Sequence, residues 1–190
     1  MHVETTADLI SAAKAGAAVA GHLPAYHNVK PSDLAKMRIS DGQARLIARS
    51  GMKLVPTYPV ARFRYKSLEE KGDPGLVGRA QVYSVQAANL SALHRAGATL
   101  LTGTDVSTPI ADEVKQWVEV GGLPAPAALQ AALATGRLMF PDRRIGCFDA
   151  GCEADFLVLS ADPSRDLDAL SAIVRRVKGG VELQAPAAEQ

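Results

Sequence analysis

Residues 98–105 have the sequence ATLLTGTD, a short apolar run that ends in a polar turn. An apolar run of this length, bounded by a glycine, predicts a buried strand over residues 98–102, with Asp105 just beyond its carboxyl end. Residues 19–23 (VAGHL) repeat the arrangement with His22 at the strand end, and residues 53–58 (KLVPTY) form a third such run. The chain therefore places polar side chains directly after short buried strands.

Helical segments separate these strands. Ser40 and Gln43 have the spacing of a capping box, in which each side chain bonds the other residue's backbone amide, and Gly51 is placed to end that helix. Strands that alternate with helices predict a parallel sheet, and four such units amount to half of an eight-stranded β/α barrel. The expected helices cover residues 4–18, 40–51, 79–95, 110–120 and 126–136.

The pattern changes near residue 140. A strand is expected at 154–159, and residues 173–183 have the pattern of a hairpin that turns at a glycine pair. We therefore divide the chain into a partial barrel at 1–139, part of a small β domain at 140–184 and a disordered tail at 185–190. Residues 25–39 are expected to form a polar connection. The charged, glycine-rich insertion at 59–78 has the length typical of a lid or of a disordered loop.

The composition is that of a soluble globular protein. The chain has 190 residues, 47% of them hydrophobic and 22% charged, and a formal net charge of +1. This balance gives no strong field for nucleic acid or anionic lipid, no apolar run is long enough to span a membrane, and no signal peptide is visible. The default expectation is a cytoplasmic protein that acts on a small molecule. Cys147 and Cys152 form a poor zinc motif, and two separate structural thiols are favoured over a disulfide.

Three residues stand where β/α enzymes place their sites, at the carboxyl ends of parallel strands. They are His2, His22 and Asp105. Two imidazoles and a carboxylate at one barrel mouth can bind a divalent cation, and Asp105 could also accept a proton from water. Each residue also has a simpler interpretation. His2 could be a solvated terminal residue, His22 a hydrogen-bonding residue at a strand end, and Asp105 a helix cap or turn residue. His94 lies inside a predicted helix and is expected to pack or face solvent.

Four stretches resemble the amidohydrolase superfamily, in particular its imidazolonepropionase-like and Xaa-Pro-dipeptidase-like members. The last of them contains the ADFLVLSADP run, where such chains leave the barrel for a small β domain. The motifs follow the family's order and spacing over nearly the whole chain, which makes them specific as a set. They cover residues 2–5, 15–24, 101–105 and 146–163.

The resemblance implies a fold and a reaction. It implies the C-terminal half of a TIM-type (β/α)8 barrel plus a few strands of a small β-sandwich domain. By match, His2, His22 and Asp105 take the places of the family's ligands for one or two divalent metal ions, often zinc, and Asp105 that of its proton shuttle. The implied reaction is hydrolysis of a carbon–nitrogen bond in an amide, a cyclic amide or a dipeptide.

The sequence also departs from the family. It contains no His-x-His pair, and only Met1 precedes His2. We therefore expect a chain that lacks the N-terminal half and has little activity alone, whether its start is an internal methionine or a genuine remnant. The open barrel edges favour homo-oligomers. Two alternatives stay open: a non-catalytic half-barrel that serves as an interaction scaffold, and a small α/β protein unrelated to metal chemistry.

The substrate is not defined by the sequence. Candidates for substrate binding are found in the strand-to-helix loops, namely Tyr26, His27, Arg62 and Arg64. The arginines could hold a substrate carboxylate through paired hydrogen bonds, or they could be solvated loop charges.

Overall fold

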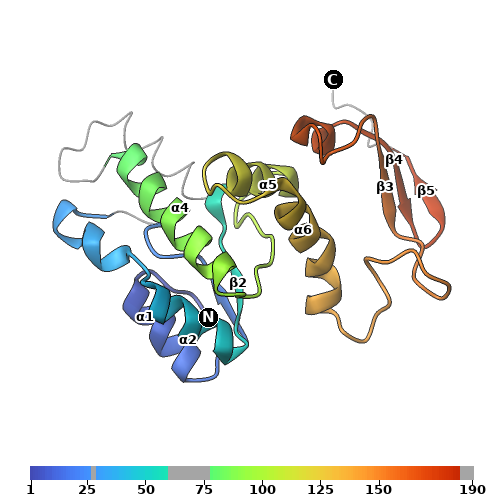
Figure 1. Ribbon diagram of the computed structural model, residues 1–190. Helices are drawn as coiled ribbons and strands as arrows, with labels where there is room; N and C mark the ends of the chain where they lie inside the picture. The colour runs from blue at the N-terminus through green and yellow to red at the C-terminus, as the bar shows by residue number, and fades with distance from the viewer. Residues whose placement is uncertain (27–28, 60–77, 185–190) are drawn as a thin grey trace.

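The computed structural model describes residues 1–26, 29–59 and 78–184 of the chain (Figure 1). The predicted tail and most of the insertion at 59–78 lie outside the described residues. The fold is a mixed α/β arrangement with two separate sheets. The α-helices are α1 (Thr6–Lys14), α2 (Asp41–Ser50), α4 (Arg79–Arg95), α5 (Ile110–Glu119) and α6 (Ala125–Met139). The 3-10 helices are η1 (Pro31–Met37) and η2 (Leu167–Ser171), and the strands are β1 (Val19–Gly21), β2 (Lys53–Val55), β3 (Phe156–Leu159), β4 (Ile173–Lys178) and β5 (Val181–Leu183).

The first sheet is parallel. Strands β1 and β2 pair with each other in parallel. A parallel bridge joins His2 to Gly21 on one side of this pair, and another joins Leu54 to Leu100 on the other side. Four segments therefore run side by side in chain order, as the alternation of strands and helices predicts. Near Leu100 the ladder is a single bridge, shorter than the predicted strand at 98–102.

Local sequence signals set the helix ends. Ser40 and Gln43 form the predicted capping box of α2, and Thr5 and Asp8 form another at the start of α1. Each box satisfies amide groups that the first helical turn leaves without a partner. Gly51 ends α2 with a φ of 74°, a left-handed conformation that glycine adopts without steric cost. The predicted helix at 79–95 is observed over those residues.

The main core lies between the parallel strands and the helices. Figure 1 shows α1, α2 and α4 beside one another on one side of these strands, and both α1 and α4 pack against α2. Each element contributes an apolar side chain with no exposed surface, and burial of such side chains is the main driving force of folding. The largest of these core side chains include Leu9, Ile47, Leu54, Leu90 and Trp117.

A buried amide ties η1 to α4. Asn89 has no exposed surface, its Oδ1 accepts the Ile39 amide at 2.8 Å, and its Nδ2 donates to the Met37 carbonyl at 2.8 Å. Both polar ends of the side chain are thus satisfied, as burial requires. The prediction of a plain polar connection at 25–39 missed η1, because no apolar period marks so short a helix.

The second sheet is antiparallel, in the order β3–β4–β5. Its β4–β5 turn is the predicted glycine pair, with φ values of 56° at Gly179 and 79° at Gly180. Asp155 accepts the Gly179 amide at 2.7 Å and pairs with Lys178, and the Lys178 hydrogen bond lowers the pKa of that carboxyl. The aspartate of the ADF run therefore anchors the hairpin. Figure 1 shows this sheet at the far end of the molecule from α1, with α5 and α6 between them.

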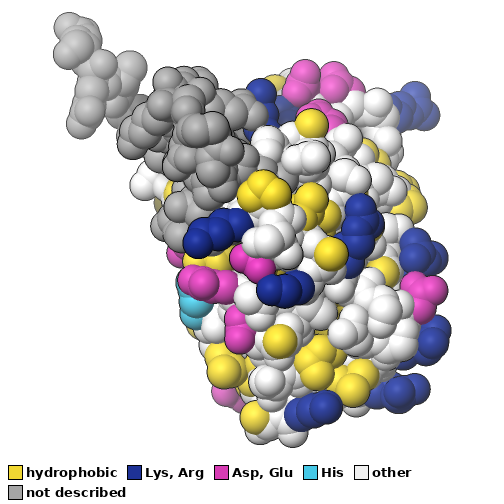
Figure 2. Space-filling view, turned by 90° about the vertical axis from the view of Figure 1, so that its left-hand side faces the viewer, with side chains coloured by type: hydrophobic (Ala, Val, Ile, Leu, Met, Phe, Trp, Pro, Cys, Tyr) yellow, Lys and Arg dark blue, Asp and Glu magenta, His cyan; other side chains and the backbone are white. Residues whose placement is uncertain are grey.

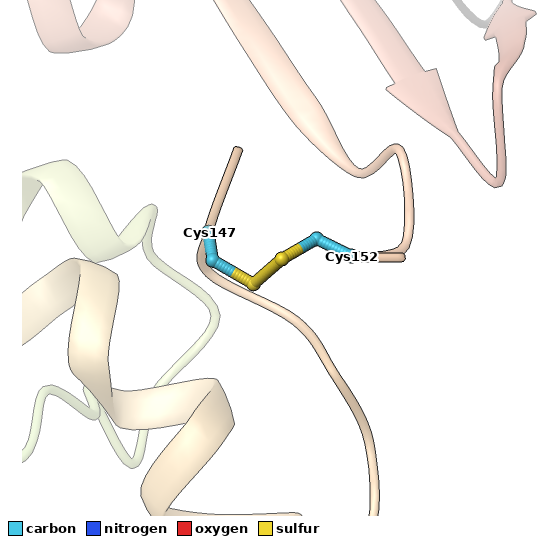
Figure 3. Close-up of a disulfide and its surroundings, with 2 residues drawn as sticks. All are labelled: Cys147 and Cys152. Atoms are coloured by element: carbon cyan, nitrogen blue, oxygen red, sulfur yellow. A yellow bond between two sulfur atoms is a disulfide. The ribbon is translucent and has the colours of Figure 1, made fainter. Parts of the chain in front are cut away.

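Cys147 and Cys152 are joined by a disulfide, with their Cα atoms 5.9 Å apart (Figure 3). The prediction of two separate thiols is therefore wrong. The chain reverses between them, since Gly151 has a φ of 84° and the Cys152 amide donates to the Asp149 carbonyl at 3.0 Å. This turn brings two cysteines that are five positions apart within bonding range, which spacing alone did not reveal.

The surface carries mixed charge. On the face in Figure 2, lysine and arginine side chains lie among acidic and hydrophobic ones, and no single kind covers the face. In the part of the chain that the structure describes, no helix combines the length and the apolar character that a membrane crossing requires.

Candidate active site

The strand ends carry unusual backbone conformations. His22, Thr57 and Asp105 have φ values of 74°, 55° and 55°, and each follows the carboxyl end of a parallel segment. Side chains other than glycine rarely adopt this region, and each such residue costs on the order of 1–3 kcal/mol, with β-branched Thr57 the most disfavoured. Because strain of this kind persists only where surrounding contacts enforce it, the three turns mark this edge as a candidate site.

His22 is the buried centre of this edge. Its side chain is 8% exposed, whereas that of Asp105 is 58% exposed. The His22 Nδ1 atom lies 2.5 Å from the Thr57 hydroxyl, and its Nε2 atom lies 3.7 Å from Asp105 Oδ2. The second distance exceeds that of a direct hydrogen bond. The two strand-end residues therefore face each other with their polar atoms close but not bonded.

His2 and Tyr26 complete the cluster. The Tyr26 ring stacks on the His22 ring with centroids 3.9 Å apart and planes 6° apart. The His2 ring meets the His22 ring edge-on at 4.8 Å, and the Tyr26 hydroxyl lies 3.0 Å from His2 Nε2. His2 is 57% exposed, and its Nε2 is also 3.4 Å from Glu4 Oε1. The structure thus places His2 and Asp105 each beside His22, the third predicted metal-site residue, and the candidate Tyr26 contacts both histidines.

Close packing shapes the turn that carries Asp105. A Cβ atom at Gly103 would lie 2.5 Å from Val55 Cγ1, so only glycine fits there without a shift. The Thr135 hydroxyl from α6 accepts the Thr102 amide at 2.9 Å and donates to its own helix. The Thr104 hydroxyl donates to the Val106 carbonyl at 2.8 Å. The glycine and threonines of the TGTD stretch are therefore explained by the turn itself.

Glu113 is the residue that the sequence analysis missed. This α5 side chain has no exposed surface, and it accepts the Thr57 amide at 2.9 Å, the Tyr58 amide at 2.7 Å and the Trp117 indole N–H at 2.8 Å. Burial raises the pKa of Glu113 to about 8, although the three donors act in the opposite direction. The sequence did contain a signal for a buried glutamate. Glu113 stands beside Val114 and four positions before Trp117, on the face of α5 that is buried.

The ligand types suit a divalent cation, but the set is small. Imidazole nitrogen and carboxylate oxygen are typical ligands of zinc. Across residues 1–26, 29–59 and 78–184, no three His, Cys, Asp or Glu side chains form a group that could hold a metal ion. His94 is exposed in the last turn of α4, in agreement with its predicted packing or solvent role. The candidates His27, Arg62 and Arg64 lie outside the described residues.

Comparison with known proteins places this geometry in context. No protein-family model and no curated protein sequence matches the chain. Among solved structures, A. niger ochratoxinase matches with a TM-score of 0.69 and 26% identity over 98% of this chain and 42% of its own. An amidohydrolase matches at 0.67 and 24%, over 98% and 44%, and a Xaa-Pro dipeptidase with bound methionine in its active site matches at 0.69 and 21%, over 97% and 44%.

The chain thus shares part of the fold of a class of hydrolases and spans less than half the length of these neighbours. More particularly, the neighbours are amidohydrolase-family proteins, and the resemblance predicted from the four sequence stretches is confirmed.

Proposed function

We propose that this chain carries half of a metal-dependent amidohydrolase site that cleaves carbon–nitrogen bonds in amides, cyclic amides or dipeptides. Residues 1–139 would supply strands five to eight of a (β/α)8 barrel, and residues 140–184 part of its small β domain. The chain-order parallel segments and the hydrolase neighbours support this proposal.

The observation that best supports this proposal is the 3.7 Å distance between His22 Nε2 and Asp105 Oδ2. The centroid of the His2 ring lies 4.8 Å from that of the His22 ring. His22, Asp105 and His2 would hold the divalent cation, with zinc the best match to these ligand types. The second nitrogen of His22 contacts the Thr57 hydroxyl, and a ligating histidine usually has a hydrogen-bond partner at that nitrogen. When bound, the cation would polarise a water molecule and lower its pKa towards about 7.

Asp105 and Tyr26 have further roles in the proposed site. Asp105 is exposed at the strand ends, so its carboxylate is accessible to take a proton from water and pass it to a leaving amine. Tyr26 is 4% exposed and is engaged with both histidines, which favours a positioning role over the substrate-binding role considered from sequence. A substrate role for His27, Arg62 and Arg64 stays a prediction.

We expect weak activity from this chain alone. The described residues hold no group of three ligands, and residues 1–190 contain no His-x-His pair. A site needs its ligands held to within about 0.5 Å. His2 and Asp105 are both more than half exposed, so they do not meet that demand. The proposed turnover is therefore that of the chain together with a half that supplies the remaining ligands. Association of copies through the open sheet edges also stays a prediction, which sedimentation velocity would measure.

Zinc titration with matched variants tests the proposal. We expect the full chain to bind zinc weakly, with binding abolished in His22→Ala and Asp105→Ala and reduced in His2→Ala. His94→Ala is the control, because it removes an exposed histidine from α4 without touching the site. Equal binding by all five proteins would overturn the proposed site. No binding by the wild-type chain, even beside a half that carries His-x-His, would favour the scaffold alternative.

A further inference from the structure

Among the described residues, the Thr57 hydroxyl has two hydrogen-bond partners, and it has one proton to donate. Its oxygen lies 2.7 Å from the Pro56 carbonyl oxygen and 2.5 Å from His22 Nδ1. A carbonyl oxygen can only accept, so the hydroxyl proton belongs on the Pro56 side. The hydroxyl oxygen must then accept from His22, which places a hydrogen on Nδ1. Both contacts are satisfied only by this arrangement.

We infer that Thr57 is a positioning residue that fixes His22 as the Nδ1–H tautomer, with the lone pair of the neutral ring on Nε2. That nitrogen is the one that faces Asp105. A neutral histidine can ligate a cation only through its unprotonated nitrogen, so the tautomer decides which side of the ring can act. The assignment itself follows from the two hydroxyl contacts, whereas its use in binding a cation rests on the proposed function.

Glu113 holds Thr57 in place. Its carboxyl group accepts the Thr57 amide at 2.9 Å and the Tyr58 amide at 2.7 Å, across a turn where Thr57 has a φ of 55°. Two hydrogen bonds to consecutive amides offset the strain of a β-branched residue in the left-handed region. Thr57 is 4% exposed, so water does not readily replace its contacts. The hydroxyl is therefore held at His22 by the backbone beneath it.

Tyr26 holds the plane of the His22 ring. The two rings are stacked, with 6° between their planes. A half-turn of the imidazole would put a ring carbon where Nδ1 now lies, 2.5 Å from the Thr57 oxygen, and this is far inside ordinary carbon–oxygen contact. Ring orientation and tautomer are thus set by neighbours on two different loops, the one after β1 and the one after β2.

Nitrogen NMR of the full chain, labelled with 15N-histidine and free of metal, tests the inference. A His22→Gln spectrum identifies the His22 signals among the four histidines. When the ring is neutral, we expect a pyrrole-type shift for Nδ1 and a pyridine-type shift for Nε2 in the wild type and in Thr57→Ser, which keeps the hydroxyl. In Thr57→Val the ring should move towards the Nε2–H tautomer that predominates for histidine in water.

Thr6→Val is the matched control. It removes another buried threonine hydroxyl, from α1, and should leave the His22 shifts unchanged. If Thr57→Val does not fold by circular dichroism, Thr57→Ala removes the same hydroxyl without a branched side chain in the strained turn. A wild-type ring with Nε2–H, or an Nδ1–H ring that survives loss of the hydroxyl in a folded variant, would overturn the inference. Failure of the chain to bind zinc would count against the proposed function and leave the tautomer result standing.

Discussion

The ring of Tyr26 lies flat against the ring of His22, with centroids 3.9 Å apart, while its hydroxyl reaches His2 Nε2 at 3.0 Å. The Tyr26 side chain thus contacts two histidines that come from different strand ends. An aromatic pair of this kind contributes about 0.5–1.5 kcal/mol beyond the burial of its surface. The two contacts are chemically separable, which makes Tyr26 a useful probe of the cluster.

Tyr26→Phe should separate positioning of His2 from support of His22. The stacking is kept and the hydroxyl contact is lost, so we expect a stability loss of about 1 kcal/mol or less and weaker zinc binding through His2. Tyr26→Leu removes both contacts and should cost more stability in urea unfolding. Equal zinc affinity in Tyr26→Phe and wild type would show that the hydroxyl does not position His2.

Glu113 should make stability depend on pH. Burial raises its pKa to about 8 from an ordinary value of 4.5, so between these values the folded chain holds a proton that the unfolded chain has released. The contribution of this group is present below the unfolded pKa and is lost as pH rises towards 8, with a slope of at most about 1.4 kcal/mol per pH unit.

Urea unfolding of wild type and Glu113→Gln from pH 5 to 8 measures this effect. The glutamine cannot ionise, so the wild-type decline should flatten in the variant. The variant also turns an amide donor towards either the Tyr58 or the Thr57 amide, so we expect lower stability at pH 5. Parallel pH profiles in the two proteins would contradict the assigned pKa.

Thr135→Val and Thr6→Val should have different effects on the free energy of unfolding. The Thr135 hydroxyl accepts the Thr102 amide, and its loss strands that amide at a cost of about 1–3 kcal/mol. The Thr6 hydroxyl is buried and finds no hydrogen-bond partner within the described chain, so Thr6→Val should be neutral or stabilising by up to about 1 kcal/mol. Unfolding midpoints of the two variants, with equal m-values, check this contrast. Equal losses would show that the Thr6 hydroxyl is bonded after all.

The disulfide should contribute stability without supporting the site. Closing so short a loop lowers the conformational entropy of the unfolded chain. In the chain-entropy model this stabilises the folded state by about 2 kcal/mol. The Cys147→Ser and Cys152→Ser double variant should lose no more than this, and its His22 NMR signals should match those of the wild type. Alkylation under denaturing conditions without reductant, read by mass spectrometry, checks the bond itself. Labelling of both cysteines in the protein as purified would contradict it.

Much of the fold was predictable because its signals are local. The box at Ser40 and Gln43, the glycine at Gly51 and the turn at Gly179 each act within a few residues, and each is observed where predicted. Helix η1 and the disulfide at Cys147 were missed because a short 3-10 helix has no apolar period and a loop reversal depends on backbone angles.

The site was predictable in part for the same reason. His22 and Asp105 end strands whose apolar runs are visible in the sequence, and the structure places them face to face. Thr57 and Glu113 contact each other across 56 positions of sequence, and nothing in either local pattern indicates the other. Residues that support a candidate site residue are thus harder to predict than that residue, since their contacts arise only in the tertiary structure.

The chain-order parallel sheet also constrains how the molecule can form. The bridge between His2 and Gly21 needs only the closure of α1, whereas Leu54 meets Leu100 only after a loop that contains all of α4 has closed. Loop closure must precede the contacts that reward it, so parallel pairings of this range form slowly. The pairing of His2 with Gly21 should therefore form before that of Leu54 with Leu100. The turn at Asp105, which follows Leu100, would then form after the strand end that carries His22.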